Sequence, residues 1–204
     1  MQIELEQGNV QQYLVESAVI DFRHPIVQKK IEKIKAQGHT QFERAEIAFC
    51  FVRDSIQHSF DKESTIVTIT ASDALLHQEG ICFAKAHLLA TLLRGMDIPT
   101  GFCYQRVTKK GTVESGYALH GLNALYLEEV GHWFRVDPRG NKAGIHSEFS
   151  VRPEKLAYLI RTKLDEVDYP TVYSEPLEEV LLAMQKATNC QELFQKRPDR
   201  ILSK

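Results

Sequence analysis

The sequence predicts an α+β fold: helices, one of them buried on most sides, then a small antiparallel sheet and a final helix. Two observations predict this class. Apolar residues recur at helical spacing in the first half of the chain, whereas three strand-like segments follow one another after residue 99. Because helices and strands are segregated along the chain, a wound parallel sheet is disfavoured.

Two amphipathic helices are predicted in the first third of the chain. Residues 25–37 start with Pro25, which suits the first turn of a helix, and stop before Gly38. Residues 41–58 are predicted to form the second helix, because their apolar residues lie on one stripe at spacings of three and four: Phe42, Ala45, Phe49, Val52 and Ile56.

A short extended segment and a buried helix come next. Residues 64–70 are rich in β-branched side chains, which favour an extended conformation, and Ser72 is placed to cap a short turn of helix after them. Residues 82–94 are apolar almost all round, so this helix is expected at the centre of the molecule. Gly95 and Pro99 end it.

The predicted sheet follows this buried helix. Residues 100–107, 117–127 and 132–137 have the composition of strands, and the turn at 129–131 makes the last two an antiparallel hairpin. Past residue 141 the pattern weakens, although residues 176–188 show the apolar spacing of a helix.

Composition indicates one soluble globular domain over residues 1–204. The chain carries 25 basic and 27 acidic side chains and 43% hydrophobic residues. The near-neutral charge argues against a dedicated nucleic-acid binder, and no apolar run approaches the roughly 18 residues of a membrane span. The acidic N-terminus lacks the features of a signal peptide, so the predicted location is the cytoplasm. The oligomeric state does not follow from the sequence.

The four cysteines are widely spaced and form no CxxC pair, so neither a zinc pair nor a redox motif is predicted. In a reducing cytoplasm no disulfide is expected. Cys50 on a helix and Cys103 in a strand are predicted to be shielded core thiols, and Cys190 is predicted to be exposed near the end of a helix.

Cys82 differs from the other cysteines because it opens the buried helix. Backbone N–H groups and the helix dipole at such a position favour an anion, which lowers the pKa of a thiol. Gly80 before it would let the chain turn sharply and let a substrate approach the sulfur. On this local evidence alone, a small hydrophobic residue in a hydrophobic helix is the simpler interpretation.

His120 and Asp137 are predicted to meet on the hairpin. His120 lies within an apolar strand and Asp137 ends the next one, at comparable distances from the turn near residue 130. A carboxylate there would hold one imidazole nitrogen and leave the other to take the thiol proton of Cys82. The alternatives are a core histidine and a turn-forming Asp-Pro pair.

Three blocks of sequence together resemble the transglutaminase-like superfamily, a branch of the papain-like cysteine enzymes. Cys82, His120 and Asp137 follow one another at separations of 38 and 17 residues, which are typical of that family. The blocks are Gly80-Ile81-Cys82 with its apolar helix and Ile98-Pro99, then His120-Gly121, then Trp133-Phe134-Arg135-Val136-Asp137-Pro138.

The resemblance covers about residues 72–140 and implies a papain-like core, with the nucleophile helix on the sheet. It implies a thioester on Cys82, with His120 as base and Asp137 orienting the imidazole, and no cofactor. The reaction would be acyl transfer or hydrolysis at a peptide or glutamine-type amide of a peptide or protein substrate, with hydrolysis favoured. The alternative is a non-catalytic peptide-binding module on the same fold.

Several other polar groups are candidates for oxyanion donors, zinc ligands or structural contacts. The N–H of Cys82 is the expected first oxyanion donor, while Gln78 is either a second donor or a solvated turn residue. His132, Asp137 and His146 lack the close spacing of zinc ligands. A polar seam against another segment is predicted for one face of the buried helix: His87, Thr91 and Arg94.

Overall fold

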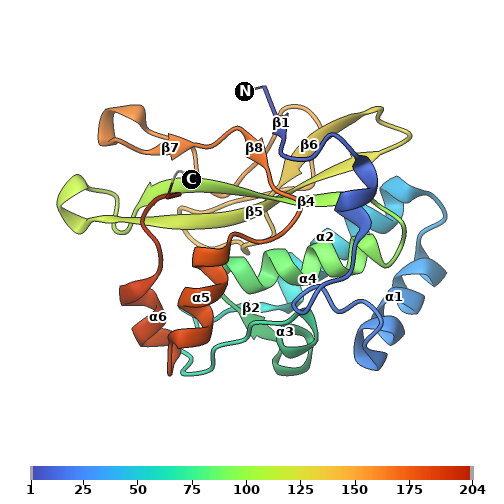
Figure 1. The fold of residues 1–204 in the computed structure, drawn as a ribbon, viewed down its shortest axis with the longest axis horizontal. Helices are drawn as coiled ribbons and strands as arrows, with labels where there is room; N and C mark the ends of the chain where they lie inside the picture. The colour runs from blue at the N-terminus through green and yellow to red at the C-terminus, as the bar shows by residue number, and fades with distance from the viewer. Residues whose placement is uncertain (1, 203–204) are drawn as a thin grey trace.

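A four-stranded antiparallel sheet packs on helix α4 (Cys82–Arg94) in the computed structural model, which describes residues 2–202 (Figure 1). The order across the sheet is β6, β5, β4, β7. These strands are β4 (Thr100–Thr108), β5 (Tyr117–Leu127), β6 (His132–Val136) and β7 (Val167–Asp168). Two short parallel pairs accompany the sheet: β1 (Glu4–Leu5) with β8 (Thr171–Val172), and β2 (Gln57–His58) with β3 (Glu79–Gly80).

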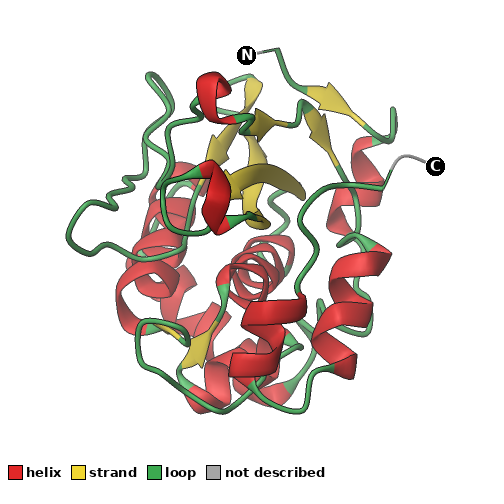
Figure 2. Ribbon diagram, turned by 90° about the vertical axis from the view of Figure 1, so that its left-hand side faces the viewer, coloured by secondary structure: helices red, strands yellow, loops and turns green. Residues whose placement is uncertain are grey.

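The remaining α-helices gather on the same side of the sheet as α4 (Figure 2). They are α1 (Pro25–Gln37), α2 (Gln41–Ser55), α3 (Ala71–His77), α5 (Glu178–Lys186) and α6 (Cys190–Lys196). Short 3-10 segments occur at Val10–Leu14, Val113–Ser115 and Thr162–Leu164. The separation of a helical layer from an antiparallel sheet confirms the α+β class. Within residues 2–202 no helix has the length and apolar character needed to cross a membrane.

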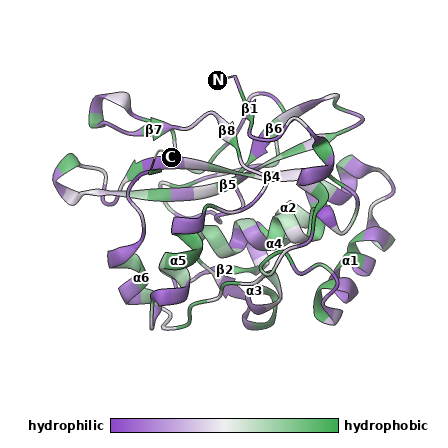
Figure 3. Cartoon of the chain, in the orientation of Figure 1, coloured by the Kyte–Doolittle hydropathy of each residue, from purple (hydrophilic) through white to green (hydrophobic). Residues whose placement is uncertain are grey.

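Helix α4 is buried along its whole length, as its sequence predicts. Helices α2 and α3 and strands β4 and β5 pack around it, and much of α4 is coloured as hydrophobic in Figure 3. Leu88, Leu89 and Leu92 are 0% exposed. Burial of one such side chain stabilises the fold by about 1.5–3 kcal/mol, so α4 is a rigid support for the residues at its ends.

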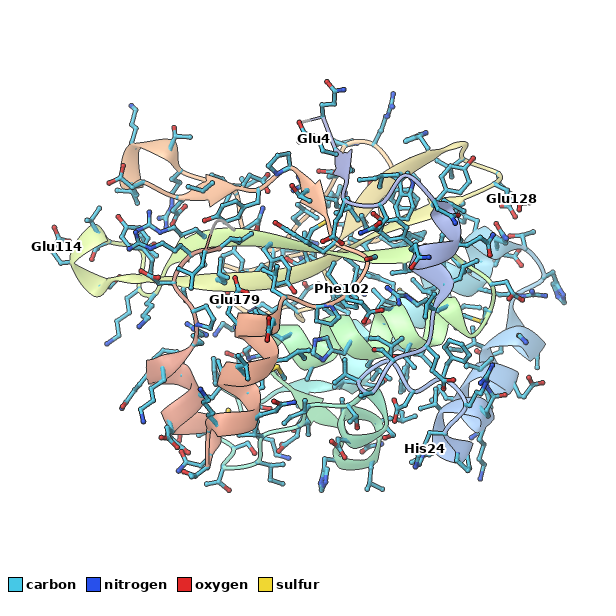
Figure 4. All side chains as sticks on the ribbon, in the orientation of Figure 1. Glu4, His24, Phe102, Glu114, Glu128 and Glu179 are labelled. Atoms are coloured by element: carbon cyan, nitrogen blue, oxygen red, sulfur yellow. The ribbon has the colours of Figure 1, made fainter. Side chains whose placement is uncertain are left out.

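The polar seam on α4 is confirmed. His87 Nδ1 lies 2.9 Å from the carbonyl oxygen of Ile69, and the His87 ring meets Phe102, which lies between the sheet and α4 (Figure 4). Arg94 donates to the carbonyl oxygens of Val15, Thr100 and Ser174. These buried side chains therefore tie α4 to three distant loops and have no place in the chemistry.

The second predicted helix is shorter than its apolar stripe indicates. The stripe predicts a helix over residues 41–58, but α2 ends at Ser55 and residues 57–58 form β2. The buried ammonium of Lys85 on α4 donates to the carbonyl oxygens of Arg53 and Ile56, which satisfies the end of the helix. A tertiary contact thus stops the helix where local sequence would continue it.

The cap of α3 differs from its prediction. Residues 64–70 are assigned to no strand, and Thr70, which is itself extended, caps α3 in place of Ser72. The Thr70 hydroxyl accepts from the N–H of Asp73, whose carboxylate accepts from the N–H of Thr70. This reciprocal capping box is the stronger start signal, because it satisfies two backbone donors.

The C-terminal region holds more structure than the sequence indicates. The predicted helix at 176–188 is confirmed as α5, but the sequence does not predict β7, β8 or α6. The prediction that Cys190 is exposed near the end of a helix is wrong. It is 1% exposed and is the first residue of α6, where burial raises its pKa to about 11.

Candidate active site

Cys82 is the first residue of α4 and lines a cleft of about 1090 Å³. Ile81 precedes the helix and offers no side-chain cap, so the first backbone N–H groups remain available to an anion at the sulfur. The thiol is 4% exposed. The predicted position of Cys82 at the start of a buried helix is confirmed.

The β5–β6 hairpin brings His120 and Asp137 together although the two residues are not paired in the strand register. Asn123 pairs with Val136, which is the last residue of β6, so the ladder stops before it reaches His120. Asp137 is the first residue after β6, and its side chain reaches the His120 ring from the loop. Its Oδ2 lies 2.7 Å from His120 Nε2.

Three donors hold the Asp137 carboxylate. Besides His120, the N–H of Arg139 donates to Oδ1 and the N–H of Ala157 donates to Oδ2, each at 3.1 Å. Burial would raise the pKa of this carboxyl, but the charge and hydrogen bond of His120 and these two N–H groups hold the pKa below its ordinary value. The ionised carboxylate therefore keeps the proton on Nε2 of His120.

Cys82 and His120 form a coupled acid–base pair. Burial would raise the pKa of the Cys82 thiol, but the hydrogen bond and charge of His120, the N–H of Gly121 and the charge of Arg197 lower it below its ordinary value. Burial would lower the pKa of His120, yet Asp137 and Cys82 raise it well above its ordinary value. These opposite directions favour a thiolate beside an imidazolium.

Aromatic packing fixes the far side of the imidazole. The ring of Tyr158 meets the ring of His120 edge to face, with centroids 4.8 Å apart and an interplanar angle of 74°. The Tyr158 hydroxyl accepts from Nε of Arg139 at 3.1 Å. His120 is thus confined between Asp137, Tyr158 and the thiol, which limits its rotation.

Gly121 allows β5 to approach α4 closely. A Cβ at this position would lie 2.6 Å from Cδ1 of Phe83, the residue that follows Cys82. Cβ atoms in proteins do not make contacts that short, so Phe83 or the strand would have to move. Glycine therefore sets the spacing between the helix of Cys82 and the strand of His120.

Replacing Gly121 by alanine is expected to lower the free energy of unfolding by about 1–3 kcal/mol through overpacking against Phe83. Urea denaturation measures the change. Gly8→Ala is the matched control, because a Cβ on Gly8 would meet nothing within 4 Å. A Gly121→Ala protein as stable as the parent would mean that the strand–helix spacing does not depend on this glycine.

Gly80 has a different role from the one predicted. It lies in β3 opposite His58 of β2, not in a sharp turn. A Cβ on it would meet Cβ of Ala84 at 2.8 Å and Oγ1 of Thr68 at 3.1 Å. The absence of a side chain therefore serves the packing of α4, and it opens no path to the sulfur.

An ion cluster forms one wall of the cleft. Asp61 accepts from both terminal nitrogens of Arg139, at 2.7 and 3.1 Å, and from Lys142. Burial would raise the pKa of Asp61, but these hydrogen bonds lower it to about 2. Burial and the charge of Arg139 hold the pKa of the neighbouring His58 well below its ordinary value, so its ring is neutral.

The other sequence candidates lie apart from this cleft or from one another. Gln78 is an exposed residue in the left-handed conformation at the end of α3, and it does not line the cleft. His132 bonds to the carbonyl of Val130, and His146 bonds to Glu148. Residues 2–202 contain no group of three His, Cys, Asp or Glu side chains arranged to hold a metal ion.

Three residues of the site come from the part of the chain that sequence reasoning left unexplained. Ala157 holds Asp137, Tyr158 packs on His120, and Arg197 lines the cleft with Cys82. None belongs to a motif, and the apolar periodicity that marks the core is weak beyond residue 141. No sequence signal identifies them.

Comparison with known proteins places this geometry in a family. The model of the transglutaminase-like superfamily matches residues 28–138, which include Cys82, His120 and Asp137. The match extends upstream of the resembling segment at 72–140 and takes in most of α1 and all of α2. No curated protein sequence matches the chain.

Two solved structures match part of this chain, and one of them has a TM-score above 0.5. One is titled a "Putative Cysteine Protease from Cytophaga hutchinsonii", with a TM-score of 0.53 and 18% identity over 65% of this chain and 43% of that chain. The other, titled "Crystal structure of a TGase", has a TM-score of 0.43 and 11% identity over 72% of this chain and 42% of that one. The chain thus spans less than half the length of either structure. By the family match across more than half of its residues, this chain belongs to the transglutaminase-like superfamily.

Proposed function

We propose that the protein is a thiol enzyme that forms a thioester on Cys82 at a peptide or glutamine-type amide. The observation that carries the proposal is the Asp137–His120 bond of 2.7 Å beside a thiol whose pKa is lowered by that same histidine. A module that only binds peptides has no need of three matched groups.

The chemistry follows from the positions of the protons. The Cys82 thiolate attacks the amide carbon, and the N–H of Cys82 at the start of α4 stabilises the resulting oxyanion. The His120 imidazolium gives its proton to the leaving amine, the C–N bond breaks, and the acyl group remains on sulfur as a thioester. Asp137 keeps the imidazole oriented and stabilises its charge throughout.

The second half of the reaction depends on the acceptor. Neutral His120 takes a proton from water, which attacks the thioester and releases an acid, or from an amine, which forms a new amide. Hydrolysis is favoured, because the sequence holds no calcium-loop pattern such as DxDxDG that would restrain cross-linking. All four cysteines are free thiols, which suits a reducing cytoplasm as the site of action.

Iodoacetamide at pH 6 is expected to label Cys82 first, because only this cysteine has a lowered pKa among the four. Burial raises the pKa of Cys103 to about 12 and that of Cys190 to about 11, so these two serve as internal controls. Mass spectrometry of the digested protein locates the label. A peptide library screened on the labelled and unlabelled proteins then identifies the turnover that Cys82 supports. Labelling at another cysteine would favour the non-catalytic peptide-binding module.

A further inference from the structure

The cleft is positively charged although the whole chain carries a net charge of −2. Among its lining residues, Lys and Arg side chains outnumber carboxylates by seven to four. Four of these cations are bound by carboxylates of the cleft itself: Arg139 and Lys142 by Asp61, Arg161 by Glu166, and Lys155 by Glu148. Lys109 and Lys110 lie in the bend after β4, where Lys110 is exposed. Arg197 is the remaining cation.

Arg197 has no carboxylate partner within residues 2–202. Its Nε is buried and makes no hydrogen bond with any part of the chain that the structure describes. Two aromatic rings hold the guanidinium instead, with its central carbon 5.0 Å from the ring centroid of Phe60 and 4.6 Å from that of Phe194. These cation–π contacts restrain the guanidinium and leave its Nε–H without an acceptor in the described part of the chain.

The backbone holds Arg197 beside the catalytic strand. Its N–H donates to the carbonyl oxygen of Leu193 at the end of α6. The next residue, Pro198, accepts a 2.8 Å hydrogen bond from the N–H of Leu119, which directly precedes His120. The side chain lines the same cleft as Cys82. A fixed cation with free donors therefore faces the space where a substrate would meet the sulfur.

We propose that Arg197 binds a carboxylate of the substrate close to the bond that is cleaved. This proposal rests on the proposed thiol chemistry and adds a substrate class to it: amides that carry a carboxylate, either a free α-carboxylate or an acidic side chain. A partly buried guanidinium without a carboxylate partner is costly, and a bound carboxylate would reduce that cost with up to two parallel hydrogen bonds. Arg197 is thus a specificity-determining residue.

Three isosteric alkylating reagents test the proposal without a known substrate. N-iodoacetyl-glutamine carries an α-carboxylate, N-iodoacetyl-glutamate α-amide carries a side-chain carboxylate, and N-iodoacetyl-glutaminamide is neutral. All three react with the same thiolate, so the ratio of an acidic to the neutral rate is independent of how far Cys82 is ionised. We expect at least one acidic reagent to alkylate Cys82 about tenfold faster than the neutral one.

The variants assign this preference to one residue. In Arg197→Gln the ratio of the acidic to the neutral alkylation rate is expected to fall to about one. In Arg197→Lys it should stay above one but below that of the parent, since the positive charge remains and the planar guanidinium with its paired N–H donors is lost. Arg200→Gln is the matched control. It removes the same charge only three residues further along the chain, but the Arg200 side chain is exposed and does not line the cleft. Circular dichroism confirms that each variant is folded.

The outcomes separate the two proposals. A parent protein that shows no preference for either acidic reagent, or a preference that Arg200→Gln also removes, would overturn the role of Arg197. The reagent with the larger Arg197-dependent ratio tells an α-carboxylate from an acidic side chain. If none of the three reagents labels Cys82, the thiol enzyme itself is refuted, and the substrate class with it.

Discussion

Asp137→Asn is expected to lower turnover by about 10²–10⁴-fold while the fold persists, as for the orienting aspartate of other triads. The amide has the shape of the carboxylate but not its charge. One of its two positions becomes NH₂, and this group must face either the N–H of Arg139 or the N–H groups of His120 and Ala157. In both orientations the imidazolium loses the anion that raises its pKa, so a smaller fraction of His120 carries the proton that the leaving amine needs.

Steady-state kinetics on a substrate found by library screening measures the effect. Asp97→Asn is the matched control: this exposed residue lies in the turn after α4, away from the cleft, in a left-handed conformation that asparagine tolerates. Its turnover should equal that of the parent. A folded Asp137→Asn protein with unchanged turnover would assign Asp137 to the structure of the Asp-Pro turn.

His120→Ala is expected to slow the alkylation of Cys82 by iodoacetamide at pH 6 on the order of 10²-fold. Without the imidazolium, only the N–H of Gly121 and the charge of Arg197 oppose the effect of burial on the thiol, so its pKa rises. A thiol with the ordinary pKa of about 8.5 is only about 0.3% ionised at pH 6, whereas a thiol paired with a cation stays largely ionised. The rate constant follows the thiolate fraction.

The pH dependence gives the sign of this effect. In the parent, the lowered pKa of Cys82 keeps the alkylation rate constant high as the pH falls toward 6. In His120→Ala the alkylation rate constant should fall with each pH unit below the raised pKa of the thiol. The difference between the two rate constants should therefore narrow above about pH 9, where the thiols of both proteins ionise. His146→Ala is the matched control, since His146 lines the same cleft but bonds to Glu148. Equal alkylation rates in the parent and in His120→Ala across the whole pH range would refute the ion pair of the Cys82 thiolate and the His120 imidazolium.

The parts of the fold that were predicted correctly have strong local signals. Helix α4 is apolar all round and is stopped by Gly95 and Pro99, and β5 is bounded by turns, so both have the predicted limits. The three candidate residues lie at the ends or in the middle of such elements, which is why their meeting could be inferred. Their catalytic role remains the proposal tested above.

The parts that were missed depend on contacts between distant segments. Strands β7 and β8 are two residues long, and each exists only because it pairs with β4 or β1 far away in the sequence. Cys190 is buried because α6 packs on the core, which its local sequence does not reveal. Ala157 and Arg197 reach the site in the same way, through loops whose composition carries no periodicity.

The complete burial of α4 has a consequence for how this fold can change. A helix without a free face cannot accept a new side chain without repacking its neighbours. Much of the cleft lining, in contrast, comes from the loop residues 139–161 and from the end of α6. Substitutions are therefore tolerated more readily in these parts of the cleft than on α4, so the cleft can change its lining while Cys82 keeps its position.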